Sequence, residues 1–295
     1  MPAPEWLAEQ FEEHRAHLRA VAYRMLGSAS DADDAVQESW IRLDRTDVSD
    51  VRNLRGWLTT VTARVCLDML RTRTSRREDP LDVHVPDPVI TRIDRNPESD
   101  AVFADSVGLA LLVVLETLEP AERLAFVLHD VFGMTFDEIA PIVDRSSVAA
   151  RQLASRARRR VQSTAPDAER DVARQQRVLD AFMAAVNDGD FERLVAVLHP
   201  DIVLRADGGP LAGASRVVRG AQAVAAQAAT FSRLGLSTQP VLVNGHVGVV
   251  SRRSDGRLFS VLGFTIADDK VVEINILADP ERLSRLDLTA IETEA

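Results

Sequence analysis

The sequence of 295 residues has little cysteine, little lysine and no long apolar run. Its single cysteine, Cys66, excludes an intramolecular disulfide and any CxxC metal site. The longest apolar run, residues 107–115, is far shorter than the roughly 20 residues that cross a bilayer. The first residues lack the basic start and apolar stretch of a secretory signal. We therefore expect a soluble cytoplasmic protein that has no metal, no cofactor and no membrane partner.

Positive charge is carried almost entirely by arginine, because Lys270 is the only lysine among 35 basic residues. With 45 acidic residues the net charge is -10, so the chain as a whole is not a nonspecific binder of polyanions. Any contact with nucleic acid must come from local basic patches. The densest patch is residues 145–160, which contain six arginines and no acidic residue.

Hydropathy patterns divide the chain into several parts. Apolar residues recur at helical spacing in residues 9–77 and again in 101–161, and Ser30 is the predicted N-cap of the helix that follows it. The four prolines of residues 78–100 predict an extended linker. Residues 170–295 predict helix, helix, strand, helix and four further strands, with hairpin turns at 254–257 and 267–270. An antiparallel sheet curled around helices fits that order.

The basic patch forms the second half of a predicted helix-turn-helix. Thr135 and Glu138 have the spacing of a capping box, and Ser146 or Ser147 caps the next helix. Pro141 lies inside the first helix and is expected to kink it. A second helix of this kind can enter the major groove of DNA, where arginine and glutamine reach base edges. The competing interpretation is an amphipathic helix with a solvated basic face.

Three segments resemble one family. Residues 132–161 resemble the C-terminal DNA-reading region of bacterial RNA polymerase sigma factors of the extracytoplasmic-function class, and residues 22–43 and 53–77 resemble the N-terminal domain of that class. The remainder resembles the SnoaL-like (NTF2-like) α+β cone that one subgroup carries at its C-terminus. The stretches "RADGGP" and "LADPERL" stand where that subgroup has a DGG-containing loop and an NPDxL-like tail. The sequence departs from the subgroup at Ala278, where asparagine is expected, and at "HVPDP", where a Trp-Leu-Pro motif is expected.

The resemblance implies a multidomain fold: two all-α sigma domains, the second with the helix-turn-helix, followed by the α+β cone. The expected parts are an N-terminal domain (1–77), a linker (78–100), a helix-turn-helix domain (101–163) and a SnoaL-like regulatory domain (170–295). The expected partners are promoter DNA, the clamp helices of the β′ subunit of core RNA polymerase, and a small ligand in the cavity of the C-terminal domain. No catalytic residue is implied.

The implied contact residues fall into four groups. The −35 element of the promoter is assigned to Ser147, Arg151, Gln152, Ser155, Arg156, Arg158 and Arg159. The −10 element is assigned to Asn53, Arg55, Thr60, Arg64, Arg71 and Arg73. Polymerase binding is assigned to Asp34, Gln37, Glu38 and Arg42. Regulatory contacts to residues 1–77 or to the linker are assigned to Asp207, Gly208, Gly209, Asp279, Pro280 and Leu283.

Two other functions are weighed beside a sigma factor. A ligand-responsive helix-turn-helix regulator would bind duplex DNA as a dimer without polymerase. An isomerase or cyclase would use a carboxylate or imidazole base in an apolar pocket, with Asp201, Asp207, His199 and His246 as candidates. No spacing brings these four together, and resemblance of fold is a weak argument for chemistry. A second nucleic-acid surface at residues 33–77 favours the sigma factor.

Overall fold

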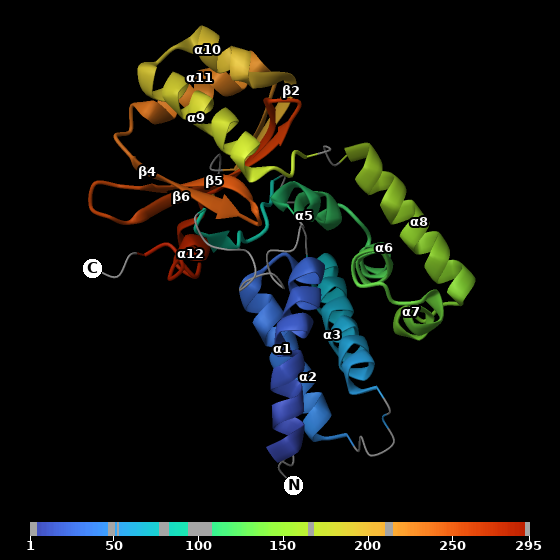
Figure 1. Cartoon of the computed structure of the whole chain (residues 1–295). Helices are drawn as coiled ribbons and strands as arrows, with labels where there is room; N and C mark the ends of the chain where they lie inside the picture. The colour runs from blue at the N-terminus through green and yellow to red at the C-terminus, as the bar shows by residue number, and fades with distance from the viewer. Residues whose placement is uncertain are drawn as a thin grey trace. The chain divides into compact units, whose positions relative to one another are not determined.

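The computed structural model describes residues 5–46, 51, 53–76, 83–93, 108–164, 168–209 and 215–292 (Figure 1). The chain forms two compact units. The first contains Met1–Pro80 and Val114–Thr164, and the second contains Leu81–Val113 and Ala165–Ala295. Helix α5, Leu109–Glu116, therefore belongs in part to each unit. The predicted helical residues 101–107 and the loop residue Pro210 lie outside the described residues.

The N-terminal part of the first unit is built from α1 (Glu5–Leu26), α2 (Ala29–Asp44) and α3 (Leu54–Arg76). Trp40 and Trp57 both pack against the apolar cluster between these helices, as their place in apolar stripes predicts. The prediction of Ser30 as N-cap is wrong. Ser28 is the cap, because its extended backbone lets its hydroxyl accept the Asp31 amide.

The rest of the first unit contains α6 (Pro120–Phe126), the π-helix η1 (Val127–Val131), α7 (Phe136–Val143) and α8 (Ser147–Thr164). The predicted capping box is present: the Thr135 hydroxyl accepts the Glu138 amide, and the Glu138 carboxylate accepts the Thr135 amide. The Ser146 hydroxyl accepts the Ala149 amide and so caps α8. Helix α7 continues through Pro141 for two further residues.

The second unit is an α+β domain with a seven-stranded sheet in the order β1-β4-β5-β6-β7-β2-β3. Helices α9, α10 and α11 lie on one side of it (Figure 1). The helices and strands are α9 (Val172–Asp188), α10 (Phe191–Val197), α11 (Ala221–Ser232), α12 (Pro280–Leu283), β1 (Ile90–Thr91), β2 (Leu198–Asp207), β3 (Arg216–Arg219), β4 (Ser237–Val243), β5 (His246–Arg252), β6 (Leu258–Ala267) and β7 (Lys270–Leu277).

The two predicted hairpins are confirmed by the antiparallel pairs β5–β6 and β6–β7. The sheet is antiparallel apart from one pair, since β2 runs parallel to β7. Such a pair needs a long crossover, and the chain between these strands includes α11 and four other strands. The sequence analysis missed β3, and it missed β1, which comes from the proline-rich linker and pairs with β4.

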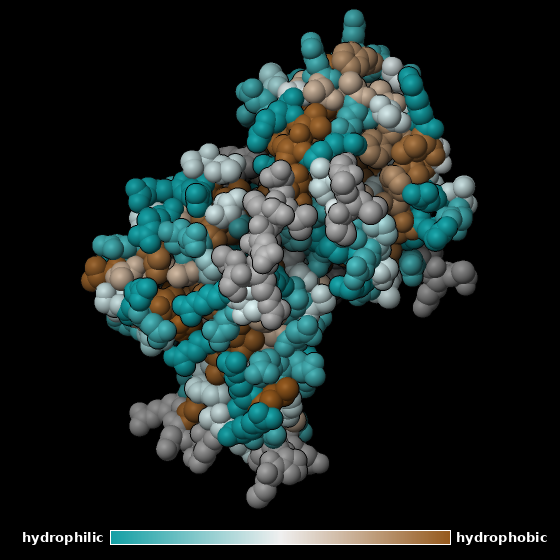
Figure 2. All heavy atoms as spheres, turned by 180° about the vertical axis from the view of Figure 1, so that it is seen from behind, coloured by the Kyte–Doolittle hydropathy of each residue, from teal (hydrophilic) through white to brown (hydrophobic). Residues whose placement is uncertain are grey.

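Apolar and polar side chains alternate in small patches on the face shown in Figure 2. Among the described helices, none combines the length and the apolar character that a bilayer span requires.

Candidate nucleic-acid interface and linker-binding site

Helix α8 presents the predicted −35 residues on its outer face. Small side chains at Ala150, Ala154 and Ala157 are fully buried, which turns the opposite face to solvent. Gln152, Ser155 and Arg159 are exposed on that face and have no partner among the described residues. These three side chains are therefore free to meet a ligand.

The other predicted −35 residues are held by neighbouring helices. Arg156 donates to Glu122 at 2.6 Å, and Arg158 pairs with Asp130 at 2.5 Å. The Arg151 guanidinium lies 5.3 Å from the centre of the Phe136 ring, and the Ser147 hydroxyl donates to Asp137. The guanidinium groups of Arg156 and Arg158 remain half-exposed, so both ion pairs are of the weak surface kind.

The predicted −10 residues lie along α3. The Asn53 side chain accepts the Gly56 amide at 2.9 Å and so holds the start of the helix. Arg55 and Arg71 are exposed, and the Thr60 hydroxyl donates to the Gly56 carbonyl. Arg73 differs from the rest, because it donates to the Leu26 carbonyl and pairs with Asp31 at the start of α2. Arg73 therefore joins α3 to the end of α1 and the start of α2.

Arg64 joins the two halves of the first unit. Its guanidinium donates to the Pro141 carbonyl in α7 at 3.1 Å. Nearby, the His17 and Phe132 rings meet edge to face at 5.3 Å, and Arg123 donates to the Arg24 carbonyl at 3.3 Å. The predicted −10 and −35 helices thus belong to one packed unit, and one predicted −10 side chain serves that packing.

Burial controls the ionisation of His17. It is the largest cause that lowers the pKa of His17 to about 4, and the charges of Arg55, His14 and Arg24 lower it further. His17 is therefore neutral at pH 7 and can meet Phe132 and the Thr59 hydroxyl without carrying a charge.

The predicted polymerase-binding residues lie on the outer side of α2. Asp34 and Gln37 are exposed, and neither has a partner among the described residues. Glu38 and Arg42 form an i,i+4 ion pair with 3.0 Å between Arg42 Nε and Glu38 Oε1. The buried face of α2 contains Ala32, Ala35, Val36, Ser39 and Leu43. These four polar side chains therefore remain accessible.

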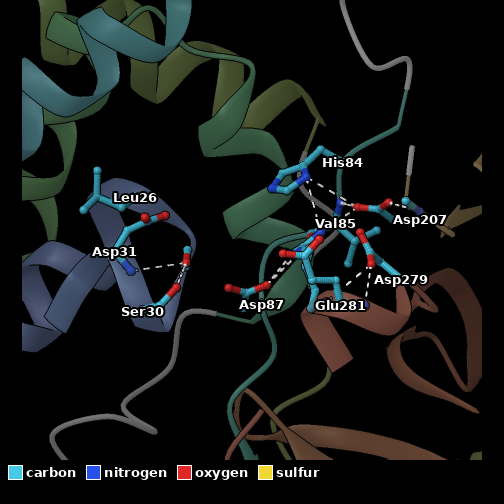
Figure 3. A network of polar contacts seen from close by, with 12 residues as sticks. Leu26, Ser30, Asp31, His84, Val85, Asp87, Asp207, Asp279 and Glu281 are labelled. Atoms are coloured by element: carbon cyan, nitrogen blue, oxygen red, sulfur yellow. Dashed lines mark hydrogen bonds and ion pairs between the residues drawn. The ribbon is translucent and has the colours of Figure 1, made fainter. Parts of the chain in front are cut away.

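In the second unit, the linker is bound by the C-terminal domain through Asp207. One oxygen of this carboxylate, Oδ2, accepts the Val85 amide at 3.0 Å and lies 3.4 Å from Nδ1 of His84. The other oxygen accepts the Gly209 amide at 3.1 Å. Figure 3 shows Asp207 beside His84 and Val85. The side chain is only 6% exposed, so a buried carboxylate holds the linker backbone.

Arg282 completes the site from α12. It donates to Asp207 Oδ2 at 2.7 Å and to the Val85 carbonyl at 2.5 Å. Its Nε and Nη2 both donate to Oδ1 of the linker residue Asp87, at 2.8 and 2.5 Å. One planar guanidinium therefore joins the domain carboxylate to the linker, a geometry that lysine does not reproduce.

Burial and hydrogen bonding act in opposite directions on Asp207. Burial is the largest influence and raises its pKa, but several groups that favour the charged form outweigh it. His84, the Val85 amide, the charge of Arg282 and the Gly209 amide together lower the pKa of Asp207 to about 2. The carboxylate is therefore ionised under ordinary conditions.

The glycine loop and the tail motif lie against each other. Gly209 has a φ of +83°, and a Cβ atom there would lie 2.6 Å from an Asp279 oxygen. The other oxygen of Asp279 accepts the Glu281 and Arg282 amides, so Asp279 caps α12 and orients Arg282. Pro280 is the first residue of α12, and Leu283, its last residue, is buried. Gly208 donates its amide to Ser215.

The linker and the start of α5 also cover part of the sheet. Val89 donates its amide to the Asn244 side chain at 3.1 Å and accepts the Asn244 amide at 2.8 Å, next to the β1–β4 pair. Leu109 lies against Gly263 on β6, where a Cβ would be 3.0 Å from its methyl group. Glycine at this position leaves room for the leucine.

Comparison with known proteins assigns each part of the chain. Residues 10–76 match the family model of Sigma-70 region 2, residues 108–161 match Sigma-70, region 4, and residues 179–275 match the SnoaL-like domain. The ECF RNA polymerase sigma factor SigJ of Mycobacterium tuberculosis is 38% identical over 290 residues, which cover 93% of this chain and 92% of SigJ. This chain belongs to the ECF RNA polymerase sigma factors.

Two further relatives agree. The probable ECF sigma factor SigI of Mycobacterium tuberculosis is 37% identical over 279 residues and covers 92% of this chain and 93% of SigI. The crystal structure of SigJ superposes with a TM-score of 0.74 at 35% identity, covering 96% of this chain and all of the other. The predicted family and the predicted fold, helical sigma domains followed by an NTF2-like α+β domain, are confirmed.

Sequence reasoning about this ECF sigma factor missed the linker site's main residues. The prediction took residues 279–283 as a contact segment, which includes Arg282, but it singled out Asp279, Pro280 and Leu283 instead. His84 and Asp87 lie in the "HVPDP" stretch, which the analysis noted as a departure from the subgroup. A usable signal was present, because a buried Asp207 requires a cation and Arg282 is the basic residue of the adjacent motif.

The four candidate bases of an enzyme are not assembled in one place. Asp207 holds the linker, while Asp201 is exposed and donates its amide to the His199 ring. Burial lowers the pKa of His246, whose ring lies against Gly108. None of the four lines the domain's apolar cavity.

Proposed function

We propose that this ECF sigma factor directs core RNA polymerase to promoters through three helices. The outer side of α2, at Asp34 and Gln37, binds the clamp helices of the β′ subunit. Helix α3 captures the opened −10 element, and α8 reads the −35 element in duplex DNA. The observation that carries the proposal is the outer face of α8, where Gln152, Ser155 and Arg159 are exposed and lack partners among the described residues. Glutamine and arginine are the side chains that read base edges in a major groove.

The test is transcription in vitro with purified core polymerase on a library of promoters. Gln152→Ala should relax the preference at one position of the −35 element and cost about 1–3 kcal/mol of discrimination there. Gln162→Ala is the matched control, since Gln162 is also exposed but lies further along the same helix. Unchanged promoter selection by Gln152→Ala would contradict the reading role.

We further propose that the C-terminal domain regulates the sigma factor in cis by holding the linker. Three contacts support this: Asp207 with the Val85 amide, Arg282 with Asp87, and Asn244 with Val89. The linker joins the two sigma regions in sequence. Capture of the linker therefore restricts how the two regions can be arranged, and its release removes that restriction. Because the domain is part of the same chain, its effective concentration is high and even a weak contact is largely formed.

Point variants test this regulation better than truncation. Removing residues 170–295 would expose the buried side chains of Val85 and Ile90 in the linker and of Leu109 in α5, and so alter the linker itself. Arg282→Ala removes the guanidinium that joins Asp207 to the linker. Arg285, three residues after Arg282, forms an exposed ion pair with Glu281 that Arg285→Ala removes. Arg282→Ala should change promoter-directed transcription, whereas Arg285→Ala should not. If both variants directed transcription as well as the native protein, the C-terminal domain would have no regulatory role.

We propose that the C-terminal domain binds rather than catalyses. General acid–base catalysis needs a titratable group within reach of the substrate. Of the described residues lining the cavity, none is ionisable. A purified protein that turned over a small molecule, with loss of turnover in Asp201→Asn or His246→Gln, would contradict this.

A further inference from the structure

The C-terminal domain contains a cavity that the linker site does not use. It measures about 120 Å³ and lies between α9, α11 and the inner face of the sheet. Its lining residues are Phe182, Met183, Val186, Asn187, Leu204, Gln227, Ala228, Phe231, Ser232, Leu236, Thr238, Val249, Ser251, Ser260, Leu262, Ile274 and Ile276. We propose that this cavity binds a small uncharged, mainly apolar molecule that forms a hydrogen bond with the hydroxyls of Ser251 and Ser260.

The two serines are the unusual part of the lining. They face each other across β5 and β6 as a directly paired position. Ser251 is 5% exposed and Ser260 is 3% exposed, yet neither hydroxyl has a hydrogen-bond partner among the described residues. Both hydroxyls line the cavity, so a molecule bound there can reach them and supply a hydrogen-bond partner. Because each hydroxyl can both donate and accept, the pair favours a ligand with one polar group over a purely apolar one.

The rest of the lining selects for a neutral molecule. The inner wall is apolar, with Leu204, Val249 and Ile274 on three different strands. The exposed lining residues Asn187, Thr238 and Ser232 are polar but uncharged. A charged ligand would lose its hydration without gaining a counter-ion, which is strongly unfavourable.

The volume limits the size of the ligand. A dry apolar cavity of about 150 Å³ in another protein holds one benzene molecule. A cavity of 120 Å³ that opens at the protein surface fits a molecule of about six to ten non-hydrogen atoms. Phenol, toluene, benzoate and benzylammonium have similar size and differ in the polar group, so they form a suitable set of probes.

Met183 provides a specific reporter for binding. The chain has five methionines, and Met183 is the one that lines the cavity. The other four, at positions 1, 25, 69 and 134, belong to the first unit and act as internal controls. The full-length protein labelled with ¹³C at the methionine methyl groups is titrated with each probe, and Met183→Leu identifies the signal.

We expect phenol to shift the Met183 signal saturably, with a Kd of about 1 mM or lower, and to leave the other methionines unchanged. Toluene should bind about threefold to tenfold more weakly than phenol, the loss typical of one hydrogen bond. Benzoate and benzylammonium should bind at least about tenfold more weakly than phenol. No saturable shift with any probe, or equal binding of the charged ones, would overturn the proposal.

Two variants and a control locate the binding site. The double variant Ser251→Ala, Ser260→Ala should remove the preference for phenol over toluene while keeping toluene binding. Ala228→Leu should fill the cavity from α11 and abolish binding of all four probes, and leucine is well tolerated in a helix. Thr230→Ala, an exposed position of α11 outside the cavity, should leave every affinity unchanged. Phenol binding that survives Ala228→Leu would overturn the location, and a preference for phenol that survives the double variant would overturn the role of the serines.

Discussion

Replacement of Arg282 by alanine removes the side chain that links Asp207 to the linker. Both carboxylates at the site are well buried, with 6% of the Asp207 side chain and 14% of the Asp87 side chain exposed. Without the guanidinium, the two negative charges remain together, and His84, the Ser215 hydroxyl and backbone amides still contact Asp207. The free energy that holds the linker should therefore fall sharply.

The size of the loss follows from the burial of the pair. Removing one partner of a buried ion pair costs about 3–5 kcal/mol, because an unpaired charge is left in a low-dielectric site. We take the lower value, about 3 kcal/mol, because the Val85 and Gly209 amides continue to stabilise Asp207. A loss of this size raises the population of the open linker by roughly a hundredfold.

Hydrogen exchange measures this opening directly. The Val85 and Val89 amides donate to Asp207 and Asn244, so their exchange reports release of the linker. In Arg282→Ala both amides should exchange up to about a hundredfold faster than in the native protein. The Val247 amide, which donates to Gln175 in the core of the domain, should keep its rate. Unchanged exchange at Val85, or an equal effect of Arg285→Ala, would refute the role given to Arg282.

Two further predictions concern other contacts. Gly209→Ala should destabilise the second unit by about 1–3 kcal/mol in chemical denaturation, because the strained φ and the contact with Asp279 add together. Gly256→Ala, with a φ of +81° but open space around it, should cost less, and equal losses would show that Asp279 does not matter. The depressed pKa of His17 means that the unfolded chain gains a proton near pH 6.5 and the folded one only near pH 4. The first unit should therefore lose stability as pH falls from 6.5 to 4, and His17→Asn should flatten that profile relative to the native protein; parallel profiles would contradict the assignment.

Local signals in the sequence predicted much of the fold correctly. The Thr135–Glu138 capping box and the turns of the C-terminal hairpins depend on residues close together in the chain, so spacing is enough to find them. The N-cap of α2 could not be resolved in the same way. Ser28 and Ser30 are both suitable residues, and the backbone angles of Ser28 decide between them.

Contacts between distant residues were not predictable from spacing. Val85 and Asp207 are 122 positions apart, and Asp87 and Arg282 are 195 apart. Charge alone also gave no warning that Arg156 and Arg158 would pair with Glu122 and Asp130 of other helices. The sequence therefore identified surfaces of the right charge without showing which of their side chains are already engaged.

The prolines of the linker explain why it can act as an edge strand. Proline cannot donate to a sheet, which confines it to edges, and it limits the conformations of the unbound chain. Pro86 and Pro88 alternate with Val85, Asp87 and Val89, the residues that contact the domain through their backbone or charge. The prolines therefore lower the entropy lost when the linker binds.

Release of the linker would have a second consequence in the sheet. Strand β1 covers the edge of β4, so release would expose unpaired backbone groups of β4 to solvent or to another strand. It would also separate Asp87 from Arg282 and leave Asp207 without the linker amide. These losses occur together, because residues 84–91 form one short, continuous segment. Binding and release of the linker are therefore expected to be cooperative, which is the property that a two-state switch in cis requires.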